Sequence, residues 1–391
     1  MNFSFVFLDF GARLLIQFIC FSLLARNIDK EFFGDVFFSL SIFTYFVVVI
    51  NSAFDSLLNK KFSEDHGLGL IFYGYSIALK LLGFMVCGGV YFFICKSSSL
   101  IFFSAMVLSF ISLMCEHQDL RLRYVGDYRN FKIKFFLGFI FSPFKVFFCY
   151  GGSVESYLFF SILEFFSIFF VNFFYVGFNW RVKGLFVFFG ENWQYLSKTF
   201  SSGFFIFTFF RLDQFFVYGY LGRSDYSHYL VAVRFNELLN SVVGIFSRFY
   251  IPKLYAGSQG YFFVIVRLWV IHVSLSLLVG IVLFLYANFW VPDYSSSLYI
   301  YMALCISGLW LVFGQLRGVF FVKNNFLMPD IYNAALGMFV FFVWLFSVNE
   351  ISALDVALGY FFGFLVSGFV STPLYGIGRE FIIALIRREN G

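Results

Sequence analysis

Charged side chains lie inside long apolar stretches of this sequence, where a charge is costly to bury. The basic ones outnumber the acidic ones: Arg13, Lys80, Lys145, Arg211, Arg234 and Arg248 against Asp55, Glu164, Asp213 and Glu237. A charged group at the centre of a bilayer costs at least ~2.5–3.5 kcal/mol, so it is expected to be paired, to reach the interface or to serve a function. The basic surplus favours chemistry on an anion, such as a phosphate or pyrophosphate.

Two of the arginines lie at matching depths in matching stretches. Arg13 lies about ten residues into the first apolar stretch, roughly 15 Å deep at helical rise. Arg211 takes the same place, within one residue, in the seventh stretch. Each could pair with an acid on a neighbouring helix, but the match favours a shared central cavity that also receives Arg234 and Lys80. We expect these four residues to contact an anionic head group.

The buried acids are candidates for ion coupling or for charge pairing. Arg234 and Glu237 are three residues apart on one helical face, which predicts an ion pair. Asp213 points to a different face of its helix from Arg211. Glu164 has no basic residue within one turn, and desolvation of such a carboxyl favours its protonated form. Asp213, Glu164 and Glu237 are therefore the predicted coupling groups, with Lys80 as an alternative partner for Glu164.

Uncharged polar residues occur at similar depths and allow two interpretations. They could donate hydrogen bonds to sugar hydroxyls or bond the helices to one another. They are Gln17, Gln214, Tyr218, Tyr220, Asn236 and Asn240.

The composition indicates that membrane-spanning helices position these residues. Hydrophobic residues make up 61% and charged residues 13% of the 391 residues, whereas soluble domains contain about half and about a quarter. Apolar windows long enough to cross a ~30 Å hydrocarbon core recur along the whole chain. We predict an all-α, polytopic membrane protein of about twelve spans, near 3–25, 35–58, 68–95, 99–116, 135–151, 154–178, 200–221, 226–250, 262–289, 297–321, 326–347 and 352–376.

The distribution of Lys and Arg over the loops predicts the orientation. With the N-terminus inside, the cytoplasmic loops and tail hold seventeen of these residues and the opposite side holds four. This bias places both termini in the cytoplasm. No cleavable signal peptide is apparent, so we expect the first span to be an uncleaved anchor.

The spans divide into two sets of six with faint internal similarity at an offset of about 197 residues. We expect an N-terminal bundle (1–180), a cytoplasmic linker with an interfacial helix (181–199) and a C-terminal bundle (200–391). Because six is an even number, both halves share one orientation and would be related by a pseudo-two-fold axis along the membrane normal. Paired bundles of this kind commonly hold substrate between them and alternate its access.

Several other functions lack their sequence signals. The six Cys residues form no CxxC pair and the four His residues show no ligand spacing, so we predict no metal site. No glycine-rich phosphate loop is present, so we expect no nucleotide and no other cofactor. The net charge of +5 needs no nucleic acid partner to explain it.

Four segments resemble the polysaccharide-unit flippases of Wzx type, within the multidrug/oligosaccharidyl-lipid/polysaccharide exporter superfamily. They are ARNIDKEFFGDVFF at 25–38, RLDQFFVYGYLGRSDYSHYLVAVRFNEL at 211–238, FSRFYIPKL at 246–254 and GQLRGVFFVKNN at 314–325. Together with the layout of six plus six spans, the likeness covers nearly the whole chain, although each motif is degenerate. Arg211 and Asp213 match the Arg-x-Asp pattern of the family, and only these two are carried over from it.

The resemblance implies a bacterial inner-membrane flippase. Its substrate would be an undecaprenyl-pyrophosphate-linked oligosaccharide, such as an O-antigen repeat unit of lipopolysaccharide, moved from the cytoplasmic to the periplasmic leaflet. It also implies ion-coupled alternating access with a proton or a sodium ion, and membrane lipids, a polymerase and chain-length proteins as partners.

Two alternatives come from other classes of protein. An O-antigen polymerase would be an enzyme of similar composition, but that family carries a large periplasmic loop with arginines, and the outer loops here are short and nearly free of Lys and Arg. A multidrug or cation antiporter of the same superfamily would need an acidic cavity, whereas the buried charges here are mainly basic. We therefore expect a transporter rather than an enzyme.

Overall fold

The structure, a computed structural model, describes residues 3–64, 66–95, 100–125, 129–176, 184–255, 260–323, 329–374 and 376–386. Within these ranges the chain forms helices joined by short turns, with no β-strand. The long helices of the first half are α1 (Phe3–Asn27), α2 (Lys30–Glu64), α3 (His66–Cys95), α4 (Leu100–Val125), α5 (Arg129–Tyr150) and α6 (Val154–Val176). Those of the second half are α7 (Leu185–Phe216), α8 (Arg223–Tyr255), α9 (Tyr261–Leu285), α10 (Ser297–Lys323), α11 (Pro329–Ser347), α12 (Ala353–Leu365) and the shorter α13 (Gly376–Ile386).

The predicted class, an all-α polytopic membrane protein, is confirmed. Each of the twelve expected spans falls on one of the helices α1 to α12. Eight helical segments within the described residues are both long and apolar enough to cross a membrane. A helix is the expected outcome because lipid offers no hydrogen bonds, so the backbone must satisfy its own N–H and C=O groups within each segment.

Short irregular helices extend three of the spans in the second half. The π-helical turns η1 (Val217–Leu221), η2 (Tyr286–Trp290) and η4 (Val366–Val370) follow α7, α9 and α12 directly. Two 3-10 turns, η3 (Pro292–Tyr294) and η5 (Thr372–Leu374), complete the connections to α10 and α13. With η4 and η5 included, the last span reaches the length that the sequence predicted for it.

Two features of the second half differ from the expected segment boundaries. Residues 185–199, expected as an interfacial segment, continue without a break into the seventh span as one helix, α7. Its first turns are held against α3, where the ring of Phe188 lies 4.7 Å from that of Phe72 and 4.9 Å from that of Tyr75. The second difference is α13, a short helix after the last span that was not expected.

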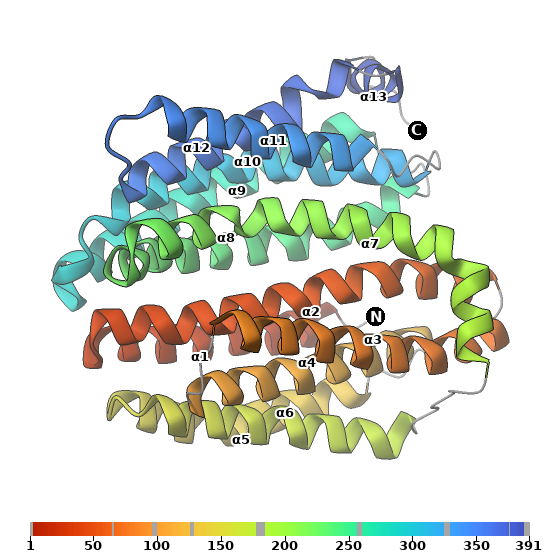
Figure 1. Cartoon of the computed structure of the whole chain (residues 1–391), viewed down its shortest axis with the longest axis horizontal. Helices are drawn as coiled ribbons and strands as arrows, with labels where there is room; N and C mark the ends of the chain where they lie inside the picture. The colour runs from red at the N-terminus through yellow and green to blue at the C-terminus, as the bar shows by residue number, and fades with distance from the viewer. Residues whose placement is uncertain are drawn as a thin grey trace. The chain divides into compact units, whose positions relative to one another are not determined.

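The helices form two compact units, Met1–Phe207 and Thr208–Gly391. In the first unit α4 packs against α6 and α2, α2 packs against α3, and α5 packs against both α1 and α6 (Figure 1). In the second unit α10 packs against α12, α8 and α9, while α11 packs against α12 and α8 against α9.

The two units share most of their helix pairings. The pairs α2·α3, α2·α4, α4·α6 and α5·α6 of the first unit recur as α8·α9, α8·α10, α10·α12 and α11·α12 of the second, each six helices further along the chain. This correspondence is the pattern that duplication of a six-helix unit would leave. It agrees with the faint repeat in the sequence.

Phenylalanine serves both the surface and the core of the first unit. Phe139 and Phe174 are about two-thirds exposed, as suits side chains that face lipid. Phe43 and Phe102 are buried instead, with ring centroids 5.0 Å apart in a core cluster. The abundance of Phe therefore reflects aromatic packing as well as lipid-facing surface.

Arg317 lies in the last turns of α10, within the tenth expected span. Its side chain is buried, and Nη1 donates to the carbonyl oxygens of Ser367 and Gly368 at 2.7 and 2.9 Å and to the hydroxyl of Thr372 at 2.9 Å. A cation is favourable at these carbonyls, which end a helix. Arg317 therefore ties α10 to the end of the last span.

Close approach of α11 and α12 depends on glycine, which leads to a first prediction. A Cβ on Gly363 would lie 2.8 Å from the carbonyl oxygen of Gly337 and 3.0 Å from the ring of Phe209. Because one of these atoms is backbone, the helices would have to separate. We expect Gly363→Ala to lower the free energy of unfolding by about 1–3 kcal/mol, measured by thermal unfolding in detergent. Gly244→Ala is the control, since a Cβ there meets no atom within 4 Å; equal losses in both variants would contradict the prediction.

Candidate functional site

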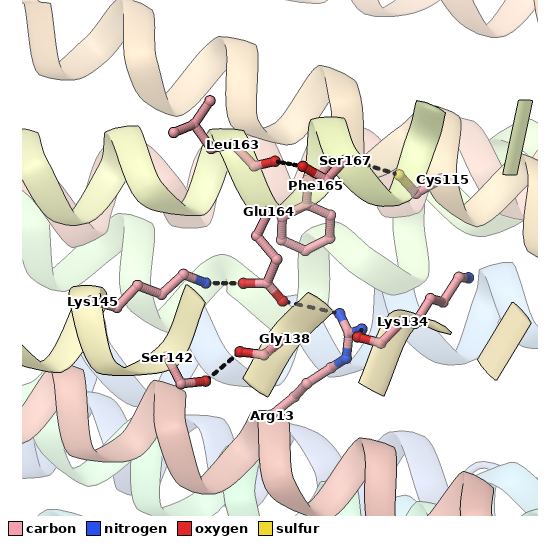
Figure 2. Close-up of polar contacts among 10 residues, drawn as sticks. All are labelled: Arg13, Cys115, Lys134, Gly138, Ser142, Lys145, Leu163, Glu164, Phe165 and Ser167. Carbon is pink, nitrogen blue, oxygen red and sulfur yellow. Dashed lines mark hydrogen bonds and ion pairs between the residues drawn. The ribbon is translucent and has the colours of Figure 1, made fainter. Parts of the chain in front are cut away.

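A buried carboxylate in the first unit lies between two cations. Glu164 of α6 accepts a very short hydrogen bond from the ammonium of Lys145 on α5. Its other oxygen, Oε1, lies 3.5 Å from Nη1 of Arg13 on α1. Figure 2 shows Lys145 and Arg13 reaching Glu164 from opposite sides. We call Arg13, Lys145 and Glu164 the Glu164 cluster.

Packing of α5 against both α1 and α6 brings this cluster together. Arg13 is fixed further by a 2.9 Å hydrogen bond from Nη2 to the carbonyl oxygen of Lys134 (Figure 2). Gly138 leaves the space, because a Cβ there would lie 3.3 Å from Oε1 of Glu164. The Glu164 side chain is 5% exposed and that of Lys145 10%, whereas that of Arg13 is 23% exposed. Arg13 is thus the most accessible member.

Glu164 has no basic residue within one turn of its own helix, so its cations come from other helices. Its two cations come from α1 and α5, which no spacing along α6 can reveal. Lys80, the partner that the sequence offered as an alternative, does not take this place. The carboxylate is therefore shared by two cations in this conformation.

A small cavity of about 50 Å³ adjoins the Glu164 cluster, between α1, α4, α5 and α6. Its polar lining comes from Gln17, Cys20, Lys145, Tyr157 and Ser161, and the remaining lining residues are apolar. This volume exceeds the roughly 10–15 Å³ that one water molecule requires. Lys145 thus reaches a space that a small polar species can occupy.

Lys80 is fully buried in a separate polar chain of the first unit. Its Nζ donates to Oδ1 of Asn51 at 2.7 Å, and Nδ2 of Asn51 donates to Oε2 of Glu116 at 2.5 Å. Asn51 therefore bridges an ammonium on α3 and a carboxylate on α4. Because Lys80 is 0% exposed, a head group cannot reach it in this conformation. We leave it out of the proposed head-group site.

The second unit holds a corresponding cluster around Glu237. Nη1 of Arg211 on α7 donates to Oε1 of Glu237 on α8 at 2.6 Å, and Nη1 of Arg234 donates to Oε2 at 2.7 Å. The pairing of Arg234 with Glu237, expected from their spacing, is present. The three side chains are between 21% and 30% exposed. We call Arg211, Arg234 and Glu237 the Glu237 cluster.

Asp213 lies apart from the Glu237 cluster on the same helix as Arg211. It is buried, and its Oδ2 accepts a 2.6 Å hydrogen bond from the hydroxyl of Tyr229 on α8. Asp213 and Tyr229 thus form a second polar link between α7 and α8. The prediction that Asp213 points away from Arg211 agrees with this partner.

The uncharged polar residues lie in different environments. Gln17 is exposed and lines the cavity beside Lys145. The side-chain oxygens of Gln214 and Asn236 are buried, with no hydrogen-bond partner among the described residues. Tyr220 is 66% exposed. The side chains of Asp55 and Arg248 lie outside the described residues.

The two clusters share the same arrangement of charges. In each, a single carboxylate is shared by two cations, one of which is the arginine of the first helix of its unit, Arg13 or Arg211. In both clusters the carboxylate is therefore bound by more than one cation, and guanidinium and ammonium donors of this kind suit contact with an anion. The sequence analysis named both arginines and both carboxylates as site residues but assigned no role to Lys145.

The fold resembles that of solved transporters. It superposes on an inward-facing multidrug resistance MATE family transporter of the MOP superfamily with a TM-score of 0.66 and 12% identity, covering 96% of both chains. The lipid II flippase MurJ, in an inward closed conformation, gives a TM-score of 0.68 and 15% identity, covering 98% of this chain and 90% of that chain. A mutant of the Vibrio cholerae MATE transporter VcmN gives 0.62 and 11%, covering 97% and 95%.

No protein-family model and no curated protein sequence matches the chain. At identities this low, the likeness establishes a shared fold, and the substrate must be argued from the residues. These three solved structures are two transporters and a flippase. The chain is a multi-pass membrane protein whose fold resembles theirs.

Proposed function

We propose that this protein is a flippase for an undecaprenyl-pyrophosphate-linked oligosaccharide, such as an O-antigen repeat unit. It would carry this lipid from the cytoplasmic to the periplasmic leaflet by ion-coupled alternating access. The proposal places the chain in a bacterial inner membrane with both termini in the cytoplasm, as the Lys and Arg distribution suggests. A polymerase and chain-length proteins are the proposed partners, and the lipid-linked sugar is the substrate.

The observation that supports this proposal is the pair of cations that binds one carboxylate in each cluster. Arg13 and Arg211, on equivalent helices of the two units, are each bound to a carboxylate that a second cation also binds. A pyrophosphate can therefore take hydrogen bonds from these guanidinium groups without leaving the carboxylates unpaired. Arginine suits this role because its planar donors match phosphate oxygens. A cationic drug would meet repulsion at the same groups.

The clusters also suggest how an ion could be coupled to the lipid. A pyrophosphate competes with the carboxylate for the same arginine. This competition weakens the ion pairs that Glu164 and Glu237 form with their arginines. A carboxylate that loses part of its positive neighbourhood binds a proton or a sodium ion more readily. We propose Glu164, Glu237 and Asp213 as the coupling groups, with the head group held by Arg13, Arg211 and Arg234.

A transport assay with two arginine variants tests the proposal. Purified protein in liposomes should move a fluorescent polyprenyl-pyrophosphate-linked oligosaccharide between leaflets, and the moved fraction is read by its accessibility to an external quencher. We expect Arg13→Ala and Arg211→Ala each to lower the rate by about tenfold or more, since a hydrogen bond to a charged group contributes ~1.5–3 kcal/mol.

Arg267→Ala is the matched control, because Arg267 is exposed on α9 and lies outside both clusters. It should keep the wild-type rate. Full activity in both cluster variants, or no movement of the lipid by the wild type, would contradict the proposal. Export of cationic dyes by the wild type, with no lipid transport, would instead support the multidrug antiporter.

A further inference from the structure

Two cysteines of the first unit meet where α1 packs against α5. The thiol of Cys149 on α5 donates a hydrogen bond to the sulfur of Cys20 on α1, and both side chains are completely buried. The ends of the same helices are joined as well, because Nδ2 of Asn27 donates to the carbonyl oxygens of Cys149 and Tyr150 at 3.4 and 2.9 Å. The packing of α1 on α5 therefore holds two free thiols in contact.

Cys20 also borders the cavity of about 50 Å³ beside the Glu164 cluster, whereas Cys149 is not among its lining residues. Lys145 lines the same cavity, and the exposed side chain of Gln17 marks its edge. The volume exceeds the roughly 10–15 Å³ that one water molecule requires, so it suits a molecule of two heavy atoms. Cys20 is thus the thiol that a small molecule in the cavity reaches.

The surroundings of Cys20 suit reaction with a peroxide. Reactive cysteines lie in electropositive sites, and the sulfenic acid that a peroxide forms on one thiol condenses with a neighbouring thiol. Here an ammonium lines the cavity that Cys20 borders, and the second thiol is in contact. Lys145 has three N–H donors, of which Glu164 accepts one, so others are available to the oxygens of a peroxide.

We propose that Cys20 and Cys149 are a site of oxidation by hydrogen peroxide, in which Cys20 reacts first and Cys149 closes a disulfide. The sulfur of Cys20 attacks one peroxide oxygen, the O–O bond breaks, and the other oxygen leaves as water with the proton of the thiol. The sulfur of Cys149 then attacks the sulfenic acid, the S–O bond breaks, and the hydroxyl leaves as water with the proton of Cys149. Two thiols are oxidised to one disulfide, and one peroxide is reduced to two water molecules.

The disulfide would join the helix that carries Arg13 to the helix that carries Lys145. Because Asn27 already ties the ends of α1 and α5 together, the bond forms between segments that are docked on one another. It also closes a long loop, from residue 20 to residue 149, and cross-links of long loops restrict the unfolded chain most. We therefore expect oxidation to stabilise the folded protein.

Mass spectrometry of the purified full-length protein tests this inference without any lipid substrate. The protein is treated with hydrogen peroxide, then denatured and alkylated. A non-reducing digest should contain Cys20 and Cys149 in one cross-linked pair of peptides, which dithiothreitol separates. Recovery of both residues as alkylated thiols, at a peroxide dose that fully oxidises glutathione, would overturn the proposal.

Cys115 is the matched control within the same protein. It is buried like the other two, but its Sγ donates to the carbonyl oxygen of Phe165 at 3.4 Å rather than to a thiol. It should be recovered as the alkylated thiol from the sample in which Cys20 and Cys149 are cross-linked. Oxidation of Cys115 to the same extent would contradict a reaction that is specific to the cavity.

Two variants test the order of the steps. In Cys149→Ala, peroxide should leave Cys20 as a sulfenic acid, which dimedone added with the denaturant converts to a thioether. In Cys20→Ala, Cys149 should remain a thiol, because it does not line the cavity. A dimedone adduct on Cys149 in Cys20→Ala, with none on Cys20 in Cys149→Ala, would overturn the assigned order.

Thermal unfolding of the wild type adds a measurement that needs no variant. The cross-linked protein should have a Tm about 5 °C or more above that of the reduced protein, and dithiothreitol should remove the difference. Coincident melting curves of the two forms would contradict a disulfide that fits the packing of α1 on α5. Failure of the lipid transport assay would leave these results unaffected.

Discussion

Replacement of Glu164 by Gln is expected to lower the free energy of unfolding by about 3–5 kcal/mol, the largest stability loss that we predict. Gln keeps the size of the side chain but removes the one negative charge that Arg13 and Lys145 share. Two like charges would then face each other in a buried site. The measurement is the unfolding midpoint in mixed micelles containing increasing fractions of SDS.

Glu237→Gln is the matched comparison. Its cluster also joins two cations to one carboxylate, but the Glu237 side chain is 30% exposed against 5% for Glu164. Solvent screens the remaining cations there, so we expect a loss of about 1 kcal/mol or less. A loss as large as that of Glu164→Gln would contradict the view that burial sets the cost.

The double variant Lys145→Met with Glu164→Gln separates pairing from other effects. Removal of the second cation leaves only Arg13, the most accessible member of the cluster. The double variant should therefore be more stable than Glu164→Gln alone, giving a coupling energy of ~1–3 kcal/mol. Additive losses would show that Lys145 and Glu164 do not stabilise one another.

Gly308→Ala is expected to cause the second large loss, about 2–3 kcal/mol, in the second unit. A Cβ on Gly308 would lie 2.2 Å from Cε1 and 2.7 Å from Nε2 of His272. The ring cannot turn aside without cost, since His272 is buried and its Nε2 is bonded to the carbonyl oxygen of Cys305 at 2.8 Å. Helices α9 and α10 would have to separate. Thermal unfolding in detergent provides the measurement.

The same helix supplies the control for this prediction. A Cβ on Gly314 meets no atom within 4 Å, so Gly314→Ala should be neutral or gain up to about 1 kcal/mol from helix propensity. Combining Gly308→Ala with His272→Ala should recover part of the stability, because the clashing ring is gone. No recovery in that double variant would place the cause elsewhere.

The fold alone does not identify the substrate of this protein. The solved relatives in fold include multidrug transporters and a lipid flippase. Neither the helix order nor the helix pairing distinguishes these activities, because both kinds share them. In this chain each shared carboxylate is bound by two cations. The proposed anionic lipid rests on those cations rather than on the fold.

Sequence alone determined that this chain crosses a membrane as about twelve helices. Each span is a local property, because insertion of a segment depends on its own hydropathy and on the need to satisfy its backbone within lipid. The chain therefore shows α1 to α12 where the apolar stretches lie. The depth of Arg13 and Arg211, and the pairing of Arg234 with Glu237, are also local, since they follow from spacing along one helix.

Only the tertiary structure decided which charges meet between helices. Glu164 receives Arg13 from α1 and Lys145 from α5, whereas Lys80 is directed to Asn51. These partners depend on how neighbouring helices rotate and pack, which hydropathy does not encode because lipid-facing and helix-facing positions are equally apolar. For the same reason the cavity beside Lys145 and the contact of Gly308 with His272 could not be read from the chain. Local hydropathy predicts where the helices lie, whereas the packing of the helices decides which side chains pair between them.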